Sequence, residues 1–256
     1  MNSKQACFIS DAHFGIRLPG HEDRERLFFN FLEREAAGWS ELYLVGDLFD
    51  FWIEYKHAIR PDYVAILHRL WQVIDRGVEI HYLAGNHDFA LGPFLKKNMG
   101  IAHYPGALSR EIQGKRVYLF HGDGLIKRDI GYRILKKLLR NPINQRIYKL
   151  LHPDIGVPLG RFFSGSSRKY LNKPLDDTFR DEYRECARKE LAHGHDVVIF
   201  GHIHLPELIK YPSGIYCNIG AWLQHYTYAT MRGGEISLWR YHDGAPAEML
   251  PAIELK

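Results

Sequence analysis

The chain has 256 residues, of which 46% are hydrophobic and 25% charged, so it can bury a substantial core and is not a disordered protein. Its formal net charge of +4 is too small to indicate nucleic-acid binding, and no apolar run approaches the ~18 residues of a membrane-spanning helix. Three widely spaced cysteines indicate free thiols, and the N-terminus lacks a signal-peptide pattern, so we expect a cytoplasmic protein.

Short apolar runs, each predicted to be a buried strand, lead directly into polar residues. These runs are residues 6–10, 42–45, 79–83, 116–120 and 197–200. Helical patterns at 25–35 and 63–76 lie between several of them. Strands that alternate with helices predict an α/β sheet covered on its faces.

Residues 127–170 interrupt this alternation. The segment 127–151 holds eight Lys or Arg and one acid, Asp129, with Leu and Ile recurring at helical spacing. Pro142 is expected to separate two helices. We therefore predict an inserted basic amphipathic helical hairpin, whose exposed side is either an ordinary solvated face or a membrane- or lipid-contacting one.

The C-terminal part has a third pattern. Runs at 207–210, 215–219, 226–231 and 235–239 alternate with turn residues and predict successive antiparallel strands. We expect them to form a second sheet packed on the first. The whole chain, 1–256, is then a single α/β domain, a two-sheet β-sandwich flanked by helices and carrying the inserted lid.

Each of the five predicted strands before this C-terminal part ends in a possible metal ligand. The motifs are Asp11-Ala12-His13, Gly46-Asp47-Leu48-Phe49-Asp50, Gly85-Asn86-His87-Asp88, His121-Gly122-Asp123 and Gly201-His202-Ile203-His204. Because ligands gather at the carboxyl ends of strands in open α/β sheets, the motifs should converge at one edge. Residues i and i+2 of an extended chain point the same way, so Asp11 pairs with His13, and His202 with His204.

Any one of these motifs alone has a simpler explanation. Asp-x-His is common by chance, an Asp such as Asp47 often caps a helix, and a lone His is usually a satisfied core or surface group. Five motifs at five strand ends favour a metal centre instead.

The order D-x-H, G-D-x-x-D, G-N-H-[DE], a later His and G-H-x-H resembles the calcineurin-like metallophosphoesterases. The resemblance implies two divalent cations. One would be held by Asp11, His13, Asp47 and His204, and the other by Asp47, Asn86, His121 and His202. Oxygen and nitrogen ligands suit Mn²⁺, Fe or Zn²⁺ better than Ca²⁺. Such a pair activates a bridging hydroxide for in-line attack on phosphorus. His87 is the candidate to donate to the leaving oxygen, with Asp50 orienting it.

Within this superfamily the chain is similar to the UDP-2,3-diacylglucosamine diphosphatases, on residues 8–13, 46–53 and 121–125 and on the helical insertion that follows. The resemblance implies cleavage of a nucleotide-sugar lipid to UMP and a lipid monosaccharide phosphate, Mn²⁺ as cofactor, and a peripheral position on the inner membrane. It implies substrate contacts by Asn86, His87 and His202, and by Asp129 and Ser167, for which helix capping or solvation is the alternative. One difference is His87, because many members carry an Arg there.

Two other functions fit part of the pattern. The basic insertion suits the phosphate backbone in a cyclic-nucleotide or nucleic-acid phosphodiesterase, although no nucleic-acid partner is expected. A non-catalytic scaffold of the same fold should have lost ligands, whereas this chain retains every one.

Overall fold

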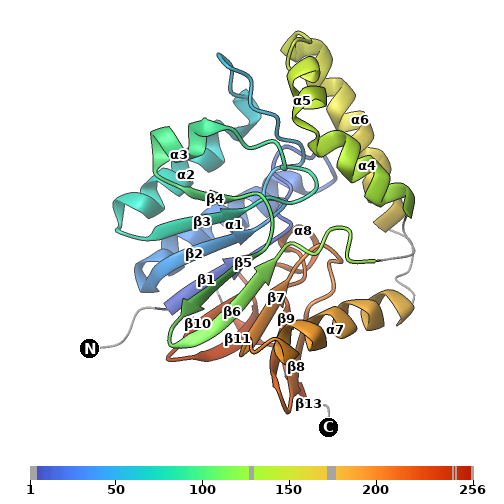
Figure 1. Ribbon diagram of the computed structural model, residues 1–256. Coiled ribbons are helices and arrows are strands. Elements are labelled where there is room, and N and C mark those ends of the chain that lie inside the picture. Colours follow the sequence, from blue (N-terminus) through green and yellow to red (C-terminus); the bar gives the residue numbers. More distant parts are fainter. Residues whose placement is uncertain (1–4, 127–129, 172–176, 244, 246, 255–256) are drawn as a thin grey trace.

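Two sheets form the centre of the computed structural model, which describes residues 5–126, 130–171, 177–243, 245 and 247–254 (Figure 1). The seven-stranded sheet contains, in spatial order, β12 (Glu248–Met249), β11 (Glu235–Arg240), β10 (Thr227–Arg232), β1 (Gln5–Ile9), β2 (Trp39–Val45), β3 (Glu79–Leu83) and β4 (Ala102–Tyr104). The six-stranded sheet contains β13 (Ile253–Glu254), β8 (Glu207–Tyr211), β9 (Gly214–Asn218), β7 (Val197–Phe200), β6 (Lys115–Phe120) and β5 (Leu108–Ile112).

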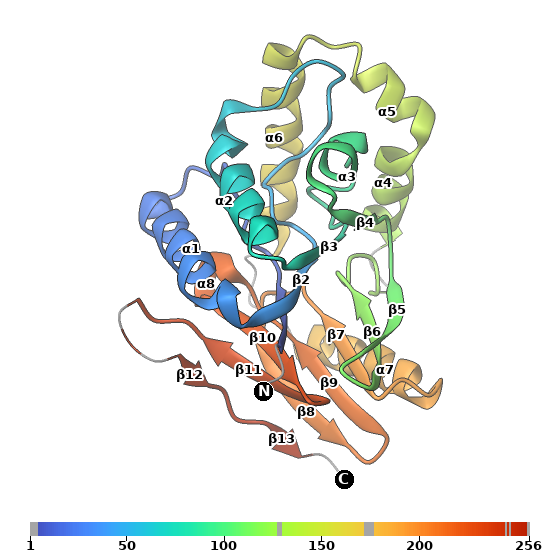
Figure 2. The ribbon, with the colours of Figure 1, turned by 90° about the vertical axis from the view of Figure 1, so that its left-hand side faces the viewer.

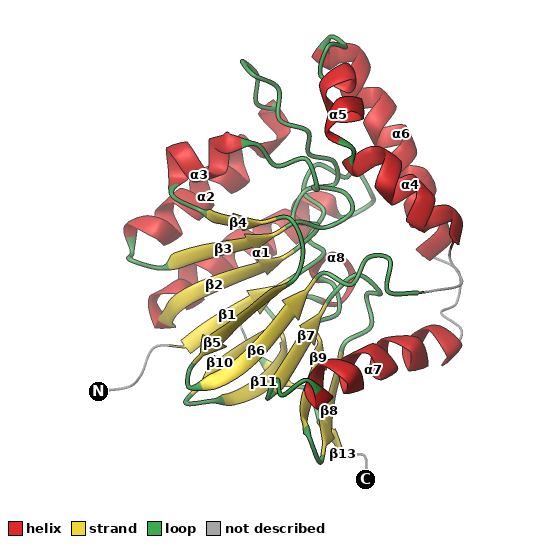
Figure 3. Ribbon diagram, viewed as in Figure 1, coloured by secondary structure: helices red, strands yellow, loops and turns green. Residues whose placement is uncertain are grey.

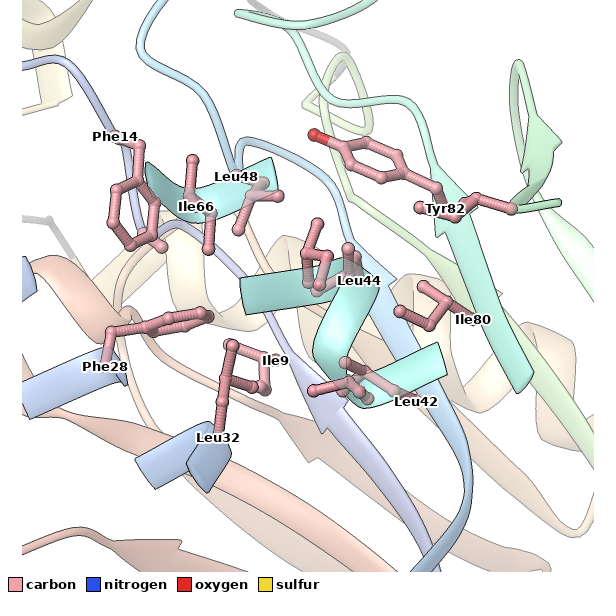
Figure 4. Packing of buried hydrophobic residues seen from close by; sticks show 14 of the residues in the cluster. Ile9, Phe14, Phe28, Leu32, Leu42, Leu44, Leu48, Ile66, Ile80 and Tyr82 are labelled. Carbon is pink, nitrogen blue, oxygen red and sulfur yellow. The ribbon is translucent and has the colours of Figure 1, made fainter. Parts of the chain in front are cut away.

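Helices cover the outer faces of this sandwich. They are α1 (His21–Glu35), α2 (Val64–Asp75) and α3 (Pro93–Met99) on the side of the seven-stranded sheet, and α7 (Asp177–Ala192) beside β7 and β9 (Figure 2). The buried face of α2 carries Ile66, Leu70 and Val73, at the spacing of an amphipathic helix. Figure 4 shows Phe28 of α1 and Ile66 of α2 packed over the sheet.

Both faces of the central strands are buried, which explains their unbroken apolar runs. In β1, Cys7 and Ile9 belong to the cluster under the helices, whereas Ala6 and Phe8 belong to the cluster between the two sheets. Successive side chains of a strand point to opposite faces, so one short run supplies both clusters.

The five predicted strands are β1, β2, β3, β6 and β7, and the predicted sandwich flanked by helices is confirmed. The predicted membership of the sheets is wrong. Strands β8 and β9 join β7 and β6 in one sheet, whereas β10 and β11 join β1 in the other. The chain crosses between the sheets in the link from β9 to β10, which contains α8 (Trp222–His225). Apolar periodicity indicates a buried strand but not its neighbour.

The insertion contains three helices rather than a hairpin of two: α4 (Ile130–Arg140), α5 (Pro142–Tyr148) and α6 (Pro153–Leu171). Pro142 begins α5, as expected. The sequence does not indicate the third helix clearly, because Pro158 and glycines such as Gly160 disfavour a helix. Gly160 lets α6 approach Phe51 closely, since a Cβ on Gly160 would lie 2.2 Å from the Phe51 Cζ atom. No described helix is long and apolar enough to cross a membrane.

Candidate metal centre

The predicted ligands lie in loops at one end of the sandwich. Parallel pairing aligns β1, β2 and β3 in one sheet and β6 and β7 in the other. The loops after these strands gather at their carboxyl ends, below helices α4–α6 (Figure 3). The motifs therefore converge from two sheets, not from the edge of a single one.

One group of side chains surrounds Asp11. The His204 Nε2 atom lies 3.2 Å from Asp11 Oδ1, and His13 Nε2 lies 3.7 Å from the same oxygen. Both Asp11 and His13 are buried. The ligand set proposed for the first cation is thus assembled around one carboxylate.

Asp47 lies between this group and a second one. Its Oδ2 atom is 3.9 Å from His13 Nε2 and 3.3 Å from His121 Nε2. On the far side, His121 Nε2 is 3.0 Å from Asn86 Oδ1 and 3.2 Å from His202 Nδ1. The structure brings all seven predicted ligands together, with Asp47 where a bridging ligand would stand.

The backbone at these ligands is not extended. Five of them adopt left-handed φ values: Asp11 54°, His13 50°, Asp47 53°, His202 71° and His204 52°. The i, i+2 argument from extended strands is therefore wrong for both pairs. Such φ values are strained for residues other than glycine and cluster at functional sites, and here sharp turns aim the side chains inward.

Asp88 holds the loop that carries Asp47. Its buried carboxylate accepts hydrogen bonds from the backbone N–H groups of Asp47 (3.2 Å), Phe49 (3.3 Å) and Gly85 (2.8 Å), and from the Tyr82 hydroxyl. Burial, followed by the charge of Asp47, raises the pKa of Asp88 to about 6. These bonds give Asp88 a structural role, because they hold the loop after β2 against the loop after β3.

Gly85 permits the close approach of the two loops. A Cβ at this position would lie 2.0 Å from Asp47 Oδ1 and 2.5 Å from the Asp47 backbone nitrogen. Any larger residue would displace the carboxylate that joins the two groups.

The electrostatics of the site suit cations. Burial lowers the pKa of His13 to about 4, and burial with the charge of His121 lowers that of His202 to about 3, so both rings are neutral near pH 7. Burial alone would raise the pKa of Asp11, but His121 and His204 hold it well below its usual range. Burial would lower the pKa of His121, but Asp47 and Asp11 raise it to about 10.

His13 offers a direct test of whether a metal fits. Both of its ring nitrogens are buried, and neither has a hydrogen-bond partner among the described residues. A neutral imidazole in this state is costly unless something else occupies its lone pair, and a divalent cation does so. The residues present therefore fit a bound metal.

His87 lies beside the two groups. Its Nε2 atom is 3.9 Å from Asp47 Oδ2, and its ring meets that of His13 edge-on at 4.8 Å between centroids. Its Nδ1 atom is 2.9 Å from the backbone carbonyl of Asp50. The sequence predicted that Asp50 orients His87, and this contact is made by the Asp50 backbone carbonyl.

Two predicted substrate contacts remain predictions. Asp129 lies outside the described residues, and only the helical backbone of α6 is described at Ser167. The sequence reasoning missed Asp123 and Arg140, which form an ion pair at 3.0 Å beside the site. The only signal for Asp123 was its place two residues after His121.

A sandwich of two mixed sheets with a polar, histidine-rich loop cluster at one end defines a metal-dependent phosphoester hydrolase. The family model for calcineurin-like phosphoesterases matches residues 6–206, and the chain belongs to that family. It is 31% identical to the UDP-2,3-diacylglucosamine hydrolase of Porphyromonas gingivalis, over 92% of this chain and 97% of the relative. It is 32% identical to the protein of the same name from Pseudomonas aeruginosa PAO1, over 78% of this chain and 81% of the relative.

A solved structure shows the same fold at much lower identity. Vacuolar Protein Sorting 29 from Cryptosporidium parvum superposes with a TM-score of 0.50 at 13% identity, covering 98% of each chain. The predicted family and fold are thereby confirmed.

Proposed function

We propose that this protein cleaves the pyrophosphate of UDP-2,3-diacylglucosamine, releasing UMP and the lipid monosaccharide phosphate. The observation that carries the proposal is the position of the apolar, basic α4–α6 segment beside the loops that carry the predicted metal ligands (Figure 1). The names of the two bacterial relatives, which align over most of both chains, agree with this substrate.

Two cations would occupy the centre, and we infer that they are Mn²⁺, with Fe or Zn²⁺ as alternatives of similar ligand preference. Asp11, His13 and His204 would hold one, Asn86, His121 and His202 the other, and Asp47 both. When bound, such a pair lowers the pKa of a water molecule and neutralises phosphate charge.

His87 is the group proposed to assist the leaving oxygen. A carbonyl oxygen only accepts hydrogen bonds, so His87 Nδ1 is protonated and donates a hydrogen bond to the Asp50 backbone carbonyl. This fixes the ring with Nε2 directed toward the Asp47 side of the centre. A protonated Nε2 in that position can donate to the departing phosphate oxygen. Asn86, His87 and His202 would also contact the substrate.

We propose that residues 127–170 form a lid inserted into the single domain and that the lid receives the acyl chains. Nine of the fourteen large hydrophobic side chains exposed among the described residues lie there: Ile130, Ile134, Leu138, Ile143, Ile147, Leu150, Ile155, Leu159 and Phe162. A cavity of about 560 Å³ lies between residues 52–63 and the start of α6. Its lining includes apolar Trp52 and Val157 beside Arg161, a mixture that suits hydrocarbon next to phosphate.

The substrate proposal is tested by an Mn²⁺-dependent assay on UDP-2,3-diacylglucosamine, beside its deacylated form and an oligonucleotide. We expect the acylated substrate to react fastest, because only it fills the apolar surface of the lid. Equal rates with and without acyl chains would sink the lipid proposal, and faster cleavage of the oligonucleotide would favour a nucleic-acid phosphodiesterase instead.

We also propose that the exposed apolar side chains of the lid attach the protein to the surface of the inner membrane. Burying a large aliphatic side chain contributes about 1.5–3 kcal/mol, so replacing both Ile134 and Leu138 with Glu should weaken binding to phosphatidylglycerol vesicles at least ~10-fold. Vesicle co-sedimentation measures this, with Val64→Glu on α2 as an exposed apolar control outside the lid. Undiminished binding of the double variant would locate the membrane contact elsewhere.

A further inference from the structure

Helix α4 faces the core with its charged side. Lys136 and Arg140 are four residues apart, so they lie on the same side of the helix, opposite the exposed Ile134 and Leu138. The side chains of Lys136 and Arg140 are only 22% and 23% exposed. This charged side reaches the loops of the metal centre.

The Arg140 guanidinium joins three separate segments. Its Nη2 atom donates to the Asp123 carboxylate (3.0 Å) and to the backbone carbonyl of Gly85 (2.9 Å). Its Nη1 atom donates to the carbonyl of Pro105, just after β4, at 3.0 Å. One side chain of the lid therefore bridges three acceptors of the core.

Lys136 strengthens the same attachment. Its Nζ atom lies 2.8 Å from the Asp123 carboxylate, donates to the Asp123 carbonyl at 2.7 Å, and stands over the Phe120 ring at 5.5 Å. Asp123 is fully buried, so its negative charge needs cationic partners, and Lys136 and Arg140 of α4 are two of them. Burial by itself would raise the pKa of Asp123, but Arg140 and His121 hold it below its usual value.

The two loops that Arg140 bridges each carry a predicted ligand of the same cation. Gly85 immediately precedes Asn86, and Asp123 follows His121 by two residues. The two ligand side chains meet at 3.0 Å, between Asn86 Oδ1 and His121 Nε2. The spacing of these two ligands therefore depends on segments that Arg140 ties together.

We propose that Arg140 is a positioning residue that couples the seating of helix α4 to one of the two metal sites, the site formed by Asn86, His121 and His202. The proposal rests on the metal centre and lid of the proposed function. A lid that is seated on the core holds the two loops at ligand distance, and a lid that lifts releases them. The other site shares Asp47, but its own three ligands, Asp11, His13 and His204, lie on neither bridged loop.

Arginine is required because of its geometry. A guanidinium presents several N–H donors in one rigid plane and can serve three acceptors at once, whereas a lysine ammonium on a flexible stem cannot span them. Arg140→Lys keeps a positive charge near Asp123 but loses the bridge, so it separates charge from positioning.

The test is a titration of the full chain with Mn²⁺. Calorimetry measures the affinity for each ion, and electron paramagnetic resonance detects the spin–spin coupling of the Mn²⁺ pair. Outer-shell changes at metal sites cost ~10–100-fold in affinity. We expect Arg140→Gln to lower the affinity for one of the two Mn²⁺ ions by that factor and to leave the affinity for the other unchanged. Arg140→Lys should behave similarly. Lys137→Gln, an exposed charge on the same helix, should match the wild type.

Wild-type affinity for both ions in the Lys and Gln variants would overturn the proposal. An equal loss of affinity for both ions, together with a lower melting temperature, would also overturn it, since that result indicates a merely structural role. Arg140→Lys retains the charge beside Asp123 and so supplies the answer if Arg140→Gln does not fold. Because Mn²⁺ binding is measured without substrate, failure to cleave UDP-2,3-diacylglucosamine would count against the proposed substrate alone.

Discussion

Replacing Asp47 with alanine is expected to remove bound metal and to abolish hydrolysis. The Asp47 carboxylate is the group that reaches both ligand clusters, at 3.9 Å from His13 Nε2 and 3.3 Å from His121 Nε2. Its loss leaves each cation one ligand short and removes the carboxylate that lies between His13 and His121. Metal ions supply several kcal/mol of charge stabilisation to phosphoryl transfer, so turnover should fall at least ~10³-fold.

Elemental analysis of the purified variant, beside its turnover, measures the effect. Asp75→Ala, which removes an exposed carboxylate at the end of α2, is the matched control and should retain two ions and full activity. Circular dichroism establishes that the variant is folded. An Asp47→Ala protein that kept two ions per chain would refute the bridging role.

Replacing His87 with alanine should lower turnover as well, but with both metal ions still bound. The His87 backbone N–H donates to Asp47 Oδ1 at 2.8 Å, and this bond survives removal of the side chain. The imidazole itself is positioned for proton transfer, which contributes at least ~10²-fold to such reactions. We therefore expect turnover to fall by that factor at unchanged metal content.

A change of leaving group sharpens this test. If His87 protonates the leaving oxygen, an aryl phosphodiester with an acidic phenol needs no such help, and His87→Ala should lose much less activity on it. His68→Ala, which removes an exposed histidine from α2, is the control. Equal losses on both substrates would assign His87 to electrostatic stabilisation, and unchanged turnover on both would remove it from the mechanism.

The family resemblance implies an arginine at this position in many members, whereas this chain has His87. An imidazole can pass a proton near neutral pH, whereas a guanidinium stays charged and binds phosphate oxygens in a fork. The hydrogen bond from His87 Nδ1 to the Asp50 carbonyl holds the ring against the main chain of Asp50.

The sequence by itself determined the chemistry and the class of fold. Metal ligands must be particular residue types, and strands buried on both faces must be continuous apolar runs, so both features can be read locally. Asp11, Asp47, Asn86, His121 and His202 each follow such a run, and this placement was sufficient to predict that they converge.

Only the tertiary structure decided how they converge. The pairing of β10 with β1 and of β9 with β7 depends on which strand edges meet in space, and periodicity carries no record of that choice. The bonds of Asp88 to Asp47 and of Arg140 to Gly85 join residues far apart in the chain. Each depends on packing between distant segments, so no local pattern could indicate which loops these two side chains hold together.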